Sequence, residues 1–269
     1  MLKVNVGIIG CGNMGQAIIN GALSRRIISS RDILVADSNK VKAKSIARRF
    51  NVRMRTDNAA LAGDVDVLIL VVKPQHSVQV LEEIKDHIKP KALVISIMAG
   101  VKIQRIAALC CYACPIVRVM PNLAAVAAES LTAICFNRNV DIKQKKIAMD
   151  LFSSIGKIYV TREKMMDAVT AVSGSGPAYF FYLAEAMIEA ACALGFSKTD
   201  ASRLVVQTLK GSSALLDQMK SDPKDIRERV TSKGGTTEAA VKVMDGKGLK
   251  DIVKAAVLAA SRRSVELSA

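Results

Sequence analysis

Aromatic residues and histidines are scarce in this chain of 269 residues. It has no tryptophan, aromatic residues make up 4% of it, and its two histidines are His76 and His87. Proteins that bind single-stranded nucleic acid stack the bases on aromatic side chains, and here the basic residues behind the formal net charge of +15 are spread over the whole chain. We therefore expect no nucleic-acid partner, because anionic small ligands or a generally basic proteome explain the charge more simply.

Metal-ligand patterns are also lacking. Cys111 and Cys114 have a C-x-x-C spacing, but a zinc site needs a second ligand pair, and the two histidines lie far away in sequence without ligand spacing. Free cysteines usually behave as small buried hydrophobic residues. We expect the cysteines to be reduced and buried, and we predict no metal site.

Long apolar runs are absent as well. No segment reaches the about 18 to 20 uninterrupted apolar residues that a membrane span needs. A strand pattern begins within four residues of Met1, so we expect no signal peptide, a cytoplasmic location and no membrane partner. Hydrophobic residues make up 51% of the chain, enough for a large aliphatic core, and the length allows two domains.

The N-terminal part, residues 1–162, alternates apolar, β-rich runs with helical patterns. The expected strands are 4–9, 32–36, 65–72, 92–97, 116–120, 131–136 and 157–160, and the expected helices are 14–24, 40–49, 77–88, 103–109 and 143–154. Continuous apolar strands divided by helices indicate a parallel sheet covered on both faces. The fold class is therefore α/β, with an N-terminal Rossmann-type dinucleotide-binding domain.

The C-terminal part, residues 163–269, shows no strand pattern. The expected helices are 164–171, 177–194, 198–218, 223–230, 237–245 and 249–267, with Ser197 capping the third and Gly195 ending the second. This predicts an all-helical C-terminal domain. Because its apolar helices have few residues to cover them, we expect the domain to pair with a second copy of the chain.

A glycine-rich segment directly follows the first expected strand and opens the first helix. It consists of Gly10, Cys11, Gly12, Asn13, Met14 and Gly15. In a G-x-G-x-x-G segment with this context, the first glycine makes a tight turn, the second lets the backbone approach a pyrophosphate, and the third lets helix and strand pack closely. The segment predicts a site for NAD(H) or NADP(H).

Asp37 ends the second strand and bears on the choice of cofactor. Its carboxylate can accept a hydrogen bond from the ribose 2′-hydroxyl, which favours NAD(H), and would repel the 2′-phosphate of NADP(H). The residues that follow, Ser38, Asn39, Lys40 and Lys42, can instead cradle that phosphate. The preference stays open, and Asp37 as a solvated strand end is the plain alternative.

Two further turns follow expected strands. Val72, Lys73 and Pro74 end the strand expected at 65–72, and Asn122 follows the strand that ends at Met120. Ligands of open parallel sheets lie outside the carboxyl ends of the strands, so these residues are expected to line the nicotinamide half of the site. Lys73 is equally a phosphate contact or a solvated turn residue, and Asn122 either bonds a ligand or belongs to an ordinary turn.

A glycine pair stands in the helical C-terminal part, within the segment Ser232-Lys-Gly-Gly-Thr-Thr237. Glycine is unfavourable inside a helix, but just before one it permits close backbone approach and leaves N–H groups at the positive end of the helix dipole. Such a place can bind a carboxylate or phosphate. A threonine-capped helix start is the plain alternative.

These segments together resemble pyrroline-5-carboxylate reductase along essentially the whole chain. The resemblance rests on Gly10–Gly15, Val72–Pro74, Met120–Asn122, Ser173–Tyr179 and Val230–Thr237, of which the last is the most specific. It implies hydride transfer from NAD(P)H to the imine carbon of a cyclic imino acid, which gives L-proline, the last step of proline biosynthesis. It also implies dimers, built into larger rings, through the C-terminal domain.

The resemblance assigns roles to the substrate-side residues. The N–H groups of Gly234, Gly235 and Thr236, with the Ser232 hydroxyl, would hold the substrate carboxylate, and Ser175 would also lie in the substrate site. Thr237 would be the catalytic residue, with its hydroxyl on the imine nitrogen. Because a hydroxyl is a poor donor of a full proton, water or a pre-protonated iminium completes the reaction.

Two positions depart from the family pattern. Lys233 stands where the family commonly has proline, which loosens the loop and adds a cation near the expected carboxylate. The three residues after Asn122 are Leu-Ala-Ala, beginning at Leu123, whereas the family often has Thr-Pro-Ala there. The contacts of that threonine are therefore unassigned.

A rival reading is a β-hydroxyacid dehydrogenase, a family of similar layout with a catalytic lysine and an amide on the helix after the glycine-serine turn. Phe180 and Leu183 occupy those places here, and neither moves a proton. A second rival, a non-enzymatic nucleotide- or nucleic-acid-binding module, is suggested only by the charge. That reading does not explain the polar residues that cluster at two separate turns.

Overall fold

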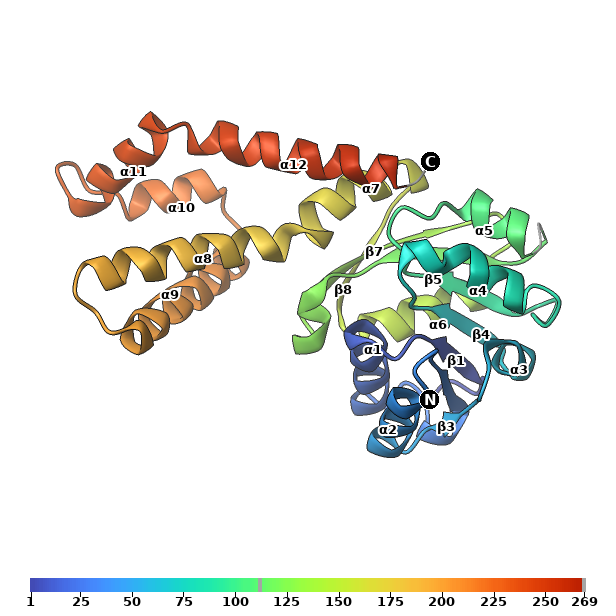
Figure 1. Ribbon diagram of the computed structural model, residues 1–269. Coiled ribbons are helices and arrows are strands. Elements are labelled where there is room, and N and C mark those ends of the chain that lie inside the picture. The colour runs from blue at the N-terminus through green and yellow to red at the C-terminus, as the bar shows by residue number, and fades with distance from the viewer. Residues whose placement is uncertain (111–112, 268–269) are drawn as a thin grey trace. The chain divides into compact units, whose positions relative to one another are not determined.

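The computed structural model describes residues 1–110 and 113–267 (Figure 1). The chain divides into two compact units, one formed by Met1–Ser175 with the chain from Ala260 onward, the other by Gly176–Ala259. Part of the C-x-x-C segment, Cys111 and Tyr112, lies outside the described residues. The expected division into 1–162 and 163–269 stays a prediction.

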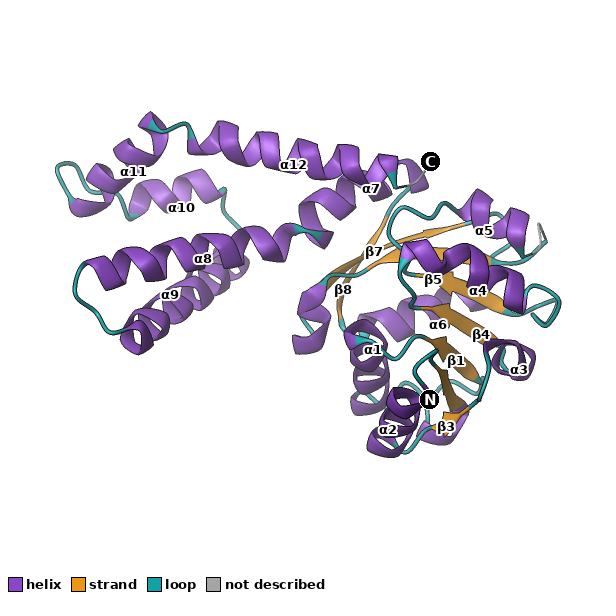
Figure 2. Ribbon diagram, viewed as in Figure 1, coloured by secondary structure: helices purple, strands orange, loops and turns teal. Residues whose placement is uncertain are grey.

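The first unit contains the sheet, whose strands are orange in Figure 2. It has eight strands in the order β3-β2-β1-β4-β5-β6-β7-β8. The strands are β1 (Val6–Ile9), β2 (Ile33–Ala36), β3 (Arg53–Met54), β4 (Val67–Leu70), β5 (Leu93–Ser96), β6 (Ile116–Met120), β7 (Ser130–Phe136) and β8 (Gly156–Val160). Val6 of β1 pairs in parallel with Ile33 on one side and Val67 on the other. The order of the first six strands is the Rossmann order, which reverses direction between β1 and β4.

One pairing differs from the parallel sheet that the sequence predicts. Strand β7 runs antiparallel to β6, whereas β8 is again parallel to β7. The connection between β6 and β7 is a short 3₁₀ segment, Leu123–Ala127. A parallel crossover needs about a dozen residues or more, so this short link allows only an antiparallel return.

Helices cover both faces of the sheet, as the apolar strands require. One face packs against α1 (Asn13–Ser24), α2 (Lys40–Phe50) and α6 (Ile142–Ser153). The other packs against α3 (Asn58–Asp64), α4 (Ser77–Ile84) and α5 (Ile103–Leu109). Successive strand residues point to opposite faces, so that Ile8 and Ile9, for example, lie in these two separate cores.

Strand β3 and helix α3 are missing from the elements that the sequence predicts. Strand β3 has only two residues, neither of them fully buried. Helix α3 has seven residues and is capped by Asp57, whose side chain accepts a hydrogen bond from the Ala60 N–H. Strand β3 is too short to show a period, and in helix α3 the only large apolar residue is Leu61, so neither element has a recognisable apolar pattern.

A buried arginine joins distant parts of the first unit. Arg118 of β6 is 3% exposed, and its guanidinium lies 3.3 Å from Glu163 Oε1 and 3.8 Å from Asp167 Oδ1. Asp167, in α7 (Met166–Val169), also accepts a hydrogen bond from the hydroxyl of Ser264, near the end of α12 (Leu249–Glu266). Buried charges need such partners, and the sequence analysis did not predict this cluster.

Helix α7 continues into a π-helical turn, Thr170–Gly174. The Ser175 N–H donates to the Thr170 carbonyl at 2.8 Å, and the Ser175 backbone is itself helical. Ser175 is therefore not an N-cap residue of α8, because such a residue has a non-helical backbone.

The second unit is helical, as predicted. Its helices are α8 (Gly176–Ala193), α9 (Lys198–Met219), α10 (Pro223–Arg229), α11 (Thr236–Gly246) and most of α12. Between α8 and α9, Gly195 has a φ of +98° and the Ser197 side chain accepts from the Asp200 N–H. These are the stop and cap predicted at Gly195 and Ser197.

Candidate active site

The glycine-rich turn lies where β1 ends and α1 begins. Gly10 has a φ of +109°, and a Cβ added there would lie 2.3 Å from the Val71 carbonyl oxygen. A Cβ on Gly15 would lie 2.2 Å from the Gly10 carbonyl oxygen, whereas a Cβ on Gly12 would meet nothing within 4 Å. The turn and close packing expected of Gly10 and Gly15 are thus present, and the Gly12 backbone is open to a ligand.

Asp37 is bonded to this turn. Its Oδ2 accepts a hydrogen bond from the Cys11 N–H at 2.8 Å, and its Oδ1 accepts one from the Asn39 N–H at 2.9 Å. Lys42 Nζ lies 3.7 Å from Oδ2. The carboxylate therefore ties the end of β2 to the glycine-rich turn, an arrangement that sequence spacing does not reveal.

A pocket of about 600 Å³ opens beside the turn, within the first unit. Its lining comes from the carboxyl ends of β1, β2 and β4, from the starts of α2 and α3, from the 3₁₀ turn before α4 and from α4 itself. The residues are Ile9, Gly10, Gly12, Asp37, Ser38, Lys40, Lys42, Asn58, Val71, Val72, Lys73, His76, Gln79, Val80 and Glu83. This is the reversal point of the strand order, where such folds bind ligands.

The pocket brings together Gly10, Gly12, Asp37, Ser38, Val72 and Lys73 of the expected cofactor residues. It also contains Asn58, His76, Gln79 and Glu83, which the sequence analysis missed. Asn58 begins the unpredicted helix α3, so its place beside β2 had no sequence signal. His76, Gln79 and Glu83 follow shortly after Pro74, which the sequence analysis did expect at the site. Their closeness to Pro74 in the sequence was the signal available for them.

The other expected cofactor residues do not line this pocket. Cys11 is fully buried, and burial together with nearby Asp37 raises the pKa of its thiol to about 11. The Cys11 N–H donates to Asp37 and its carbonyl accepts from Gln16 Nε2, so a contact of Cys11 with the cofactor stays a prediction. Asn13 lines a separate hollow with Gln16, Asn20 and residues of α2 and the 3₁₀ segment, and Met14, Gly15 and Pro74 lie outside both.

Asn122 is engaged in hydrogen bonds at the end of β6. Its amide Nδ2 donates to the Ser173 carbonyl at 3.1 Å, and its Oδ1 accepts from the Ala124 N–H at 3.0 Å. Its backbone N–H donates to the Ser130 hydroxyl. These bonds connect β6 to the π-helical turn, so the turn reading of Asn122 has direct support, and a bond to the cofactor stays a prediction.

The glycine pair Gly234–Gly235 lies directly before α11, in the second unit. Gly234 has a φ of +76°, and its N–H donates to Glu238 Oε2 at 2.7 Å. The Gly235 N–H donates to the Ser232 carbonyl at 3.0 Å. Two of the three N–H groups expected to hold a carboxylate are therefore already bonded, one to Glu238 of α11 and one to Ser232. Thr236 and Thr237 occupy the first turn of α11, where N–H groups lack helical partners.

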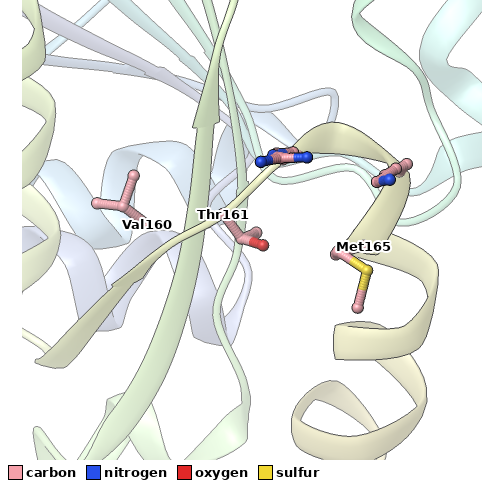
Figure 3. A pocket seen from close by; sticks show the side chains of 5 residues that line it. Val160, Thr161 and Met165 are labelled. Atoms are coloured by element: carbon pink, nitrogen blue, oxygen red, sulfur yellow. The ribbon is translucent and has the colours of Figure 1, made fainter.

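Another hollow lies between the end of β8 and the helical turn before α7. Figure 3 shows its lining residues, Val160, Thr161, Arg162, Lys164 and Met165, which include no residue expected in the site. Among the residues that the structure describes, no group of three or more His, Cys, Asp or Glu side chains is placed to hold a metal ion. Nor does any helix in the described ranges have the length and apolar character to cross a membrane.

The sheet order, the glycine-rich turn and the adjoining pocket define a Rossmann-type dinucleotide-binding domain, and the family matches make the chain an NAD(P)-dependent oxidoreductase. Residues 5–100 match the family model "NADP oxidoreductase coenzyme F420-dependent", and residues 163–267 match "Pyrroline-5-carboxylate reductase dimerisation". With the full-length relatives described next, these matches show that the chain belongs to the pyrroline-5-carboxylate reductase family.

The relatives extend over the whole chain. A pyrroline-5-carboxylate reductase of Pseudomonas aeruginosa is 38% identical over 100% of this chain and 98% of its own length. One of Methanosarcina acetivorans is 35% identical over 99% of both chains. The crystal structure of a Plasmodium falciparum pyrroline carboxylate reductase with NADP bound has a TM-score of 0.90 at 30% identity, and each chain is fully covered.

More distant structures share only the fold. A 3-hydroxyisobutyrate dehydrogenase of Mycobacterium tuberculosis has a TM-score of 0.52 at 17% identity and covers 73% of this chain. The similarity in layout therefore says nothing about alcohol chemistry here.

Proposed function

We propose that this enzyme reduces 1-pyrroline-5-carboxylate to L-proline with a hydride from NAD(P)H. The carbon of the C=N bond receives the hydride, the nitrogen ends with a proton, and oxidised NAD(P)⁺ is released. The observation that carries the proposal is the similarity of the chain, over its full length, to curated pyrroline-5-carboxylate reductases.

The pocket beside the glycine-rich turn supports the cofactor half of the proposal. We assign the adenosine ribose to the end of β2, at Asp37 and Ser38, and the pyrophosphate to the backbone of the turn near Gly12. Val72, Lys73 and Pro74 would lie along the bound cofactor, between its pyrophosphate and its nicotinamide. Cys11, Asn13, Met14 and Gly15 would contribute through the turn and the start of α1.

The loop before α11 supports the substrate half. The substrate carries one carboxylate and one imine nitrogen, so it needs an anion site and a hydrogen-bonding partner. We assign the carboxylate to the loop Ser232–Thr236 and the nitrogen to the hydroxyl of Thr237, with Ser175 as a further substrate contact. Catalysis would then rest on positioning and electrostatics, without a covalent intermediate.

Two features of the second unit support self-association of the chain. Its family match describes dimerisation, and large apolar side chains are exposed on α8, including Phe180, Phe181 and Tyr182 at 58%, 58% and 76%. A soluble chain rarely leaves such a set uncovered. We propose a dimer through these helices and rings of dimers beyond it; a cytoplasmic location without nucleic-acid or membrane partners stays the prediction from the sequence.

The assignment of Thr237 is tested by NAD(P)H oxidation with pyrroline-5-carboxylate. Thr237→Ala is expected to lower kcat/KM by about tenfold to a hundredfold, the value of one or two lost hydrogen bonds to the reacting group. Thr208→Ala removes the same atoms from an exposed position of α9, where the hydroxyl donates to Leu204, and serves as the control. Equal turnover by wild type and Thr237→Ala would remove the role given to Thr237.

A further inference from the structure

Glu238 holds the loop before α11 from within the helix. It lies in the first turn of α11, and its Oε2 accepts the Gly234 N–H at 2.7 Å. The other oxygen, Oε1, lies 3.4 Å from Lys242 Nζ, one helical turn further on. The two contacts orient the carboxylate, so that one oxygen faces the loop and the other faces the lysine.

The loop itself forms a β-turn. The Gly235 N–H donates to the Ser232 carbonyl, and Gly234, the third residue of the turn, has a φ of +76°. A positive φ at the third position is the pattern of a type II turn, which favours proline at the second position because proline presets φ near −60°. Lys233 occupies that second position, so the turn has no preset φ.

Packing does not hold this turn either. A Cβ added to Gly234 would meet nothing within 4 Å, and Lys233 and Gly234 are exposed. Between the loop ends, which are bonded to α10 and α11, the described bonds that hold Lys233 and Gly234 are therefore the turn hydrogen bond and the bond from Gly234 to Glu238. A hydrogen bond to an ionised acceptor is about twice as strong as one between neutral groups, so the Glu238 bond is the stronger of the two.

We propose that Glu238 is a positioning residue that replaces the missing conformational restraint at Lys233. By fixing Gly234, it sets the direction in which Thr236 and Thr237 enter α11 and so presents them to the substrate carboxylate and imine. This inference rests on the proposed function. Glu238 does not contact the substrate in this account; it acts through the loop.

The kinetic test compares two substitutions at Glu238 in the full-length enzyme. Glu238→Ala is expected to raise the KM for pyrroline-5-carboxylate about tenfold, the value of one charge-assisted hydrogen bond, and to change kcat and the cofactor Kd less than twofold. Glu238→Gln keeps an acceptor oxygen and should recover most of the loss. Glu228→Ala, which removes an exposed carboxylate of α10, is the matched control and should leave the KM unchanged.

A second substitution tests the link to Lys233. Lys233→Pro restores the restraint that the turn type favours. In this background Glu238→Ala should raise the KM less than about threefold, because the turn no longer depends on the carboxylate. An equal loss in both backgrounds would mean that Glu238 acts independently of the turn, and this would overturn the proposal.

Hydrogen exchange gives a readout without substrate. The Gly234 amide should exchange faster in Glu238→Ala than in wild type or Glu228→Ala, with an unchanged melting temperature. Unchanged exchange, or a KM that falls because the carboxylate had competed with the substrate for Gly234, would contradict the proposal. Absence of turnover in wild type would instead contradict the proposed function, while the exchange data would still decide whether Glu238 orders the loop.

Discussion

The chain uses glycine in two turns that are held in different ways. Gly10 and Gly15 are required because backbone atoms occupy the space where a Cβ would be, at 2.3 and 2.2 Å. Gly234 has open space around it and is required only for its φ of +76°. The first turn is thus fixed by packing against a sheet, and the second by a few hydrogen bonds at the surface. A buried turn tolerates little change, whereas an exposed one can be tuned by neighbours such as Glu238.

The largest effect is expected from Gly10→Ala. The substitution combines a backbone conformation that costs about 1–2 kcal/mol for an L-residue with a clash against the Val71 carbonyl. We expect a lower melting temperature and a loss of cofactor affinity of about a hundredfold or more. Thermal unfolding and cofactor titration measure the two.

Gly12→Ala is the matched partner of that variant. Its Cβ would meet no protein atom within 4 Å, so the melting temperature should stay near that of wild type. The methyl group would stand where the pyrophosphate approaches, so affinity for the cofactor should still fall. If Gly12→Ala binds the cofactor normally, the pyrophosphate does not approach this residue.

A smaller effect is expected from Asp37→Ala. It removes the acceptor of the Cys11 N–H and also the charge that faces a 2′-phosphate. The Kd for NADH should rise about tenfold, while the Kd for NADPH should rise less, because lost repulsion offsets the lost bond. An equal rise with both cofactors would show that Asp37 acts only through the turn, and an unchanged ratio with unchanged affinities would leave it no role.

Gly234→Ala should have a weaker effect than Gly10→Ala. Only the positive φ opposes it, at about 1 kcal/mol, which corresponds to about a fivefold loss in substrate affinity if the loop must keep its shape. Cofactor affinity should be unchanged because Gly234 is not among the residues assigned to the cofactor. A loss as large as that of Gly10→Ala would contradict the contrast between the two turns.

The smallest effect, absent near neutral pH, concerns the thiols of the first unit. Burial raises the pKa of Cys11 and of Cys135 from 9.0 to about 11. Above pH 9 these thiols ionise in the unfolded chain before they do in the folded one, so the free energy of unfolding should fall as the pH rises from 9 toward 11.

Cys192 of α8 is exposed and should react with iodoacetamide at a pH where Cys11 does not. Equal alkylation of both in the folded protein would contradict the burial of Cys11.

Long periodic elements were predictable from the sequence. Helix α5 has the predicted bounds, Ile103–Leu109, and α8 to α12 lie within about two residues of their predicted ranges, because apolar periods and caps such as Ser197 mark them. Strand β3 and the π-helical turn are too short to show a period, and helix α3 has only one large apolar residue, Leu61, so none of the three was predicted. The antiparallel direction of β7 depends on a loop length that the sequence analysis did not use.

The site was predictable where a turn has its own sequence pattern. The pattern around Gly10–Gly15 and the strand ends at Asp37 and Lys73 pointed to the pocket that the structure forms. The bonds from Asp37 to Cys11 and from Glu238 to Gly234 were not predictable, because each depends on a side-chain direction that no spacing rule encodes.

The central claim is the reaction itself. Purified enzyme, pyrroline-5-carboxylate and NADPH or NADH should give L-proline in an amount equal to the reduced cofactor consumed, measured by chiral chromatography beside the absorbance of the cofactor. Consumption without L-proline, or no consumption with either cofactor, would contradict the account.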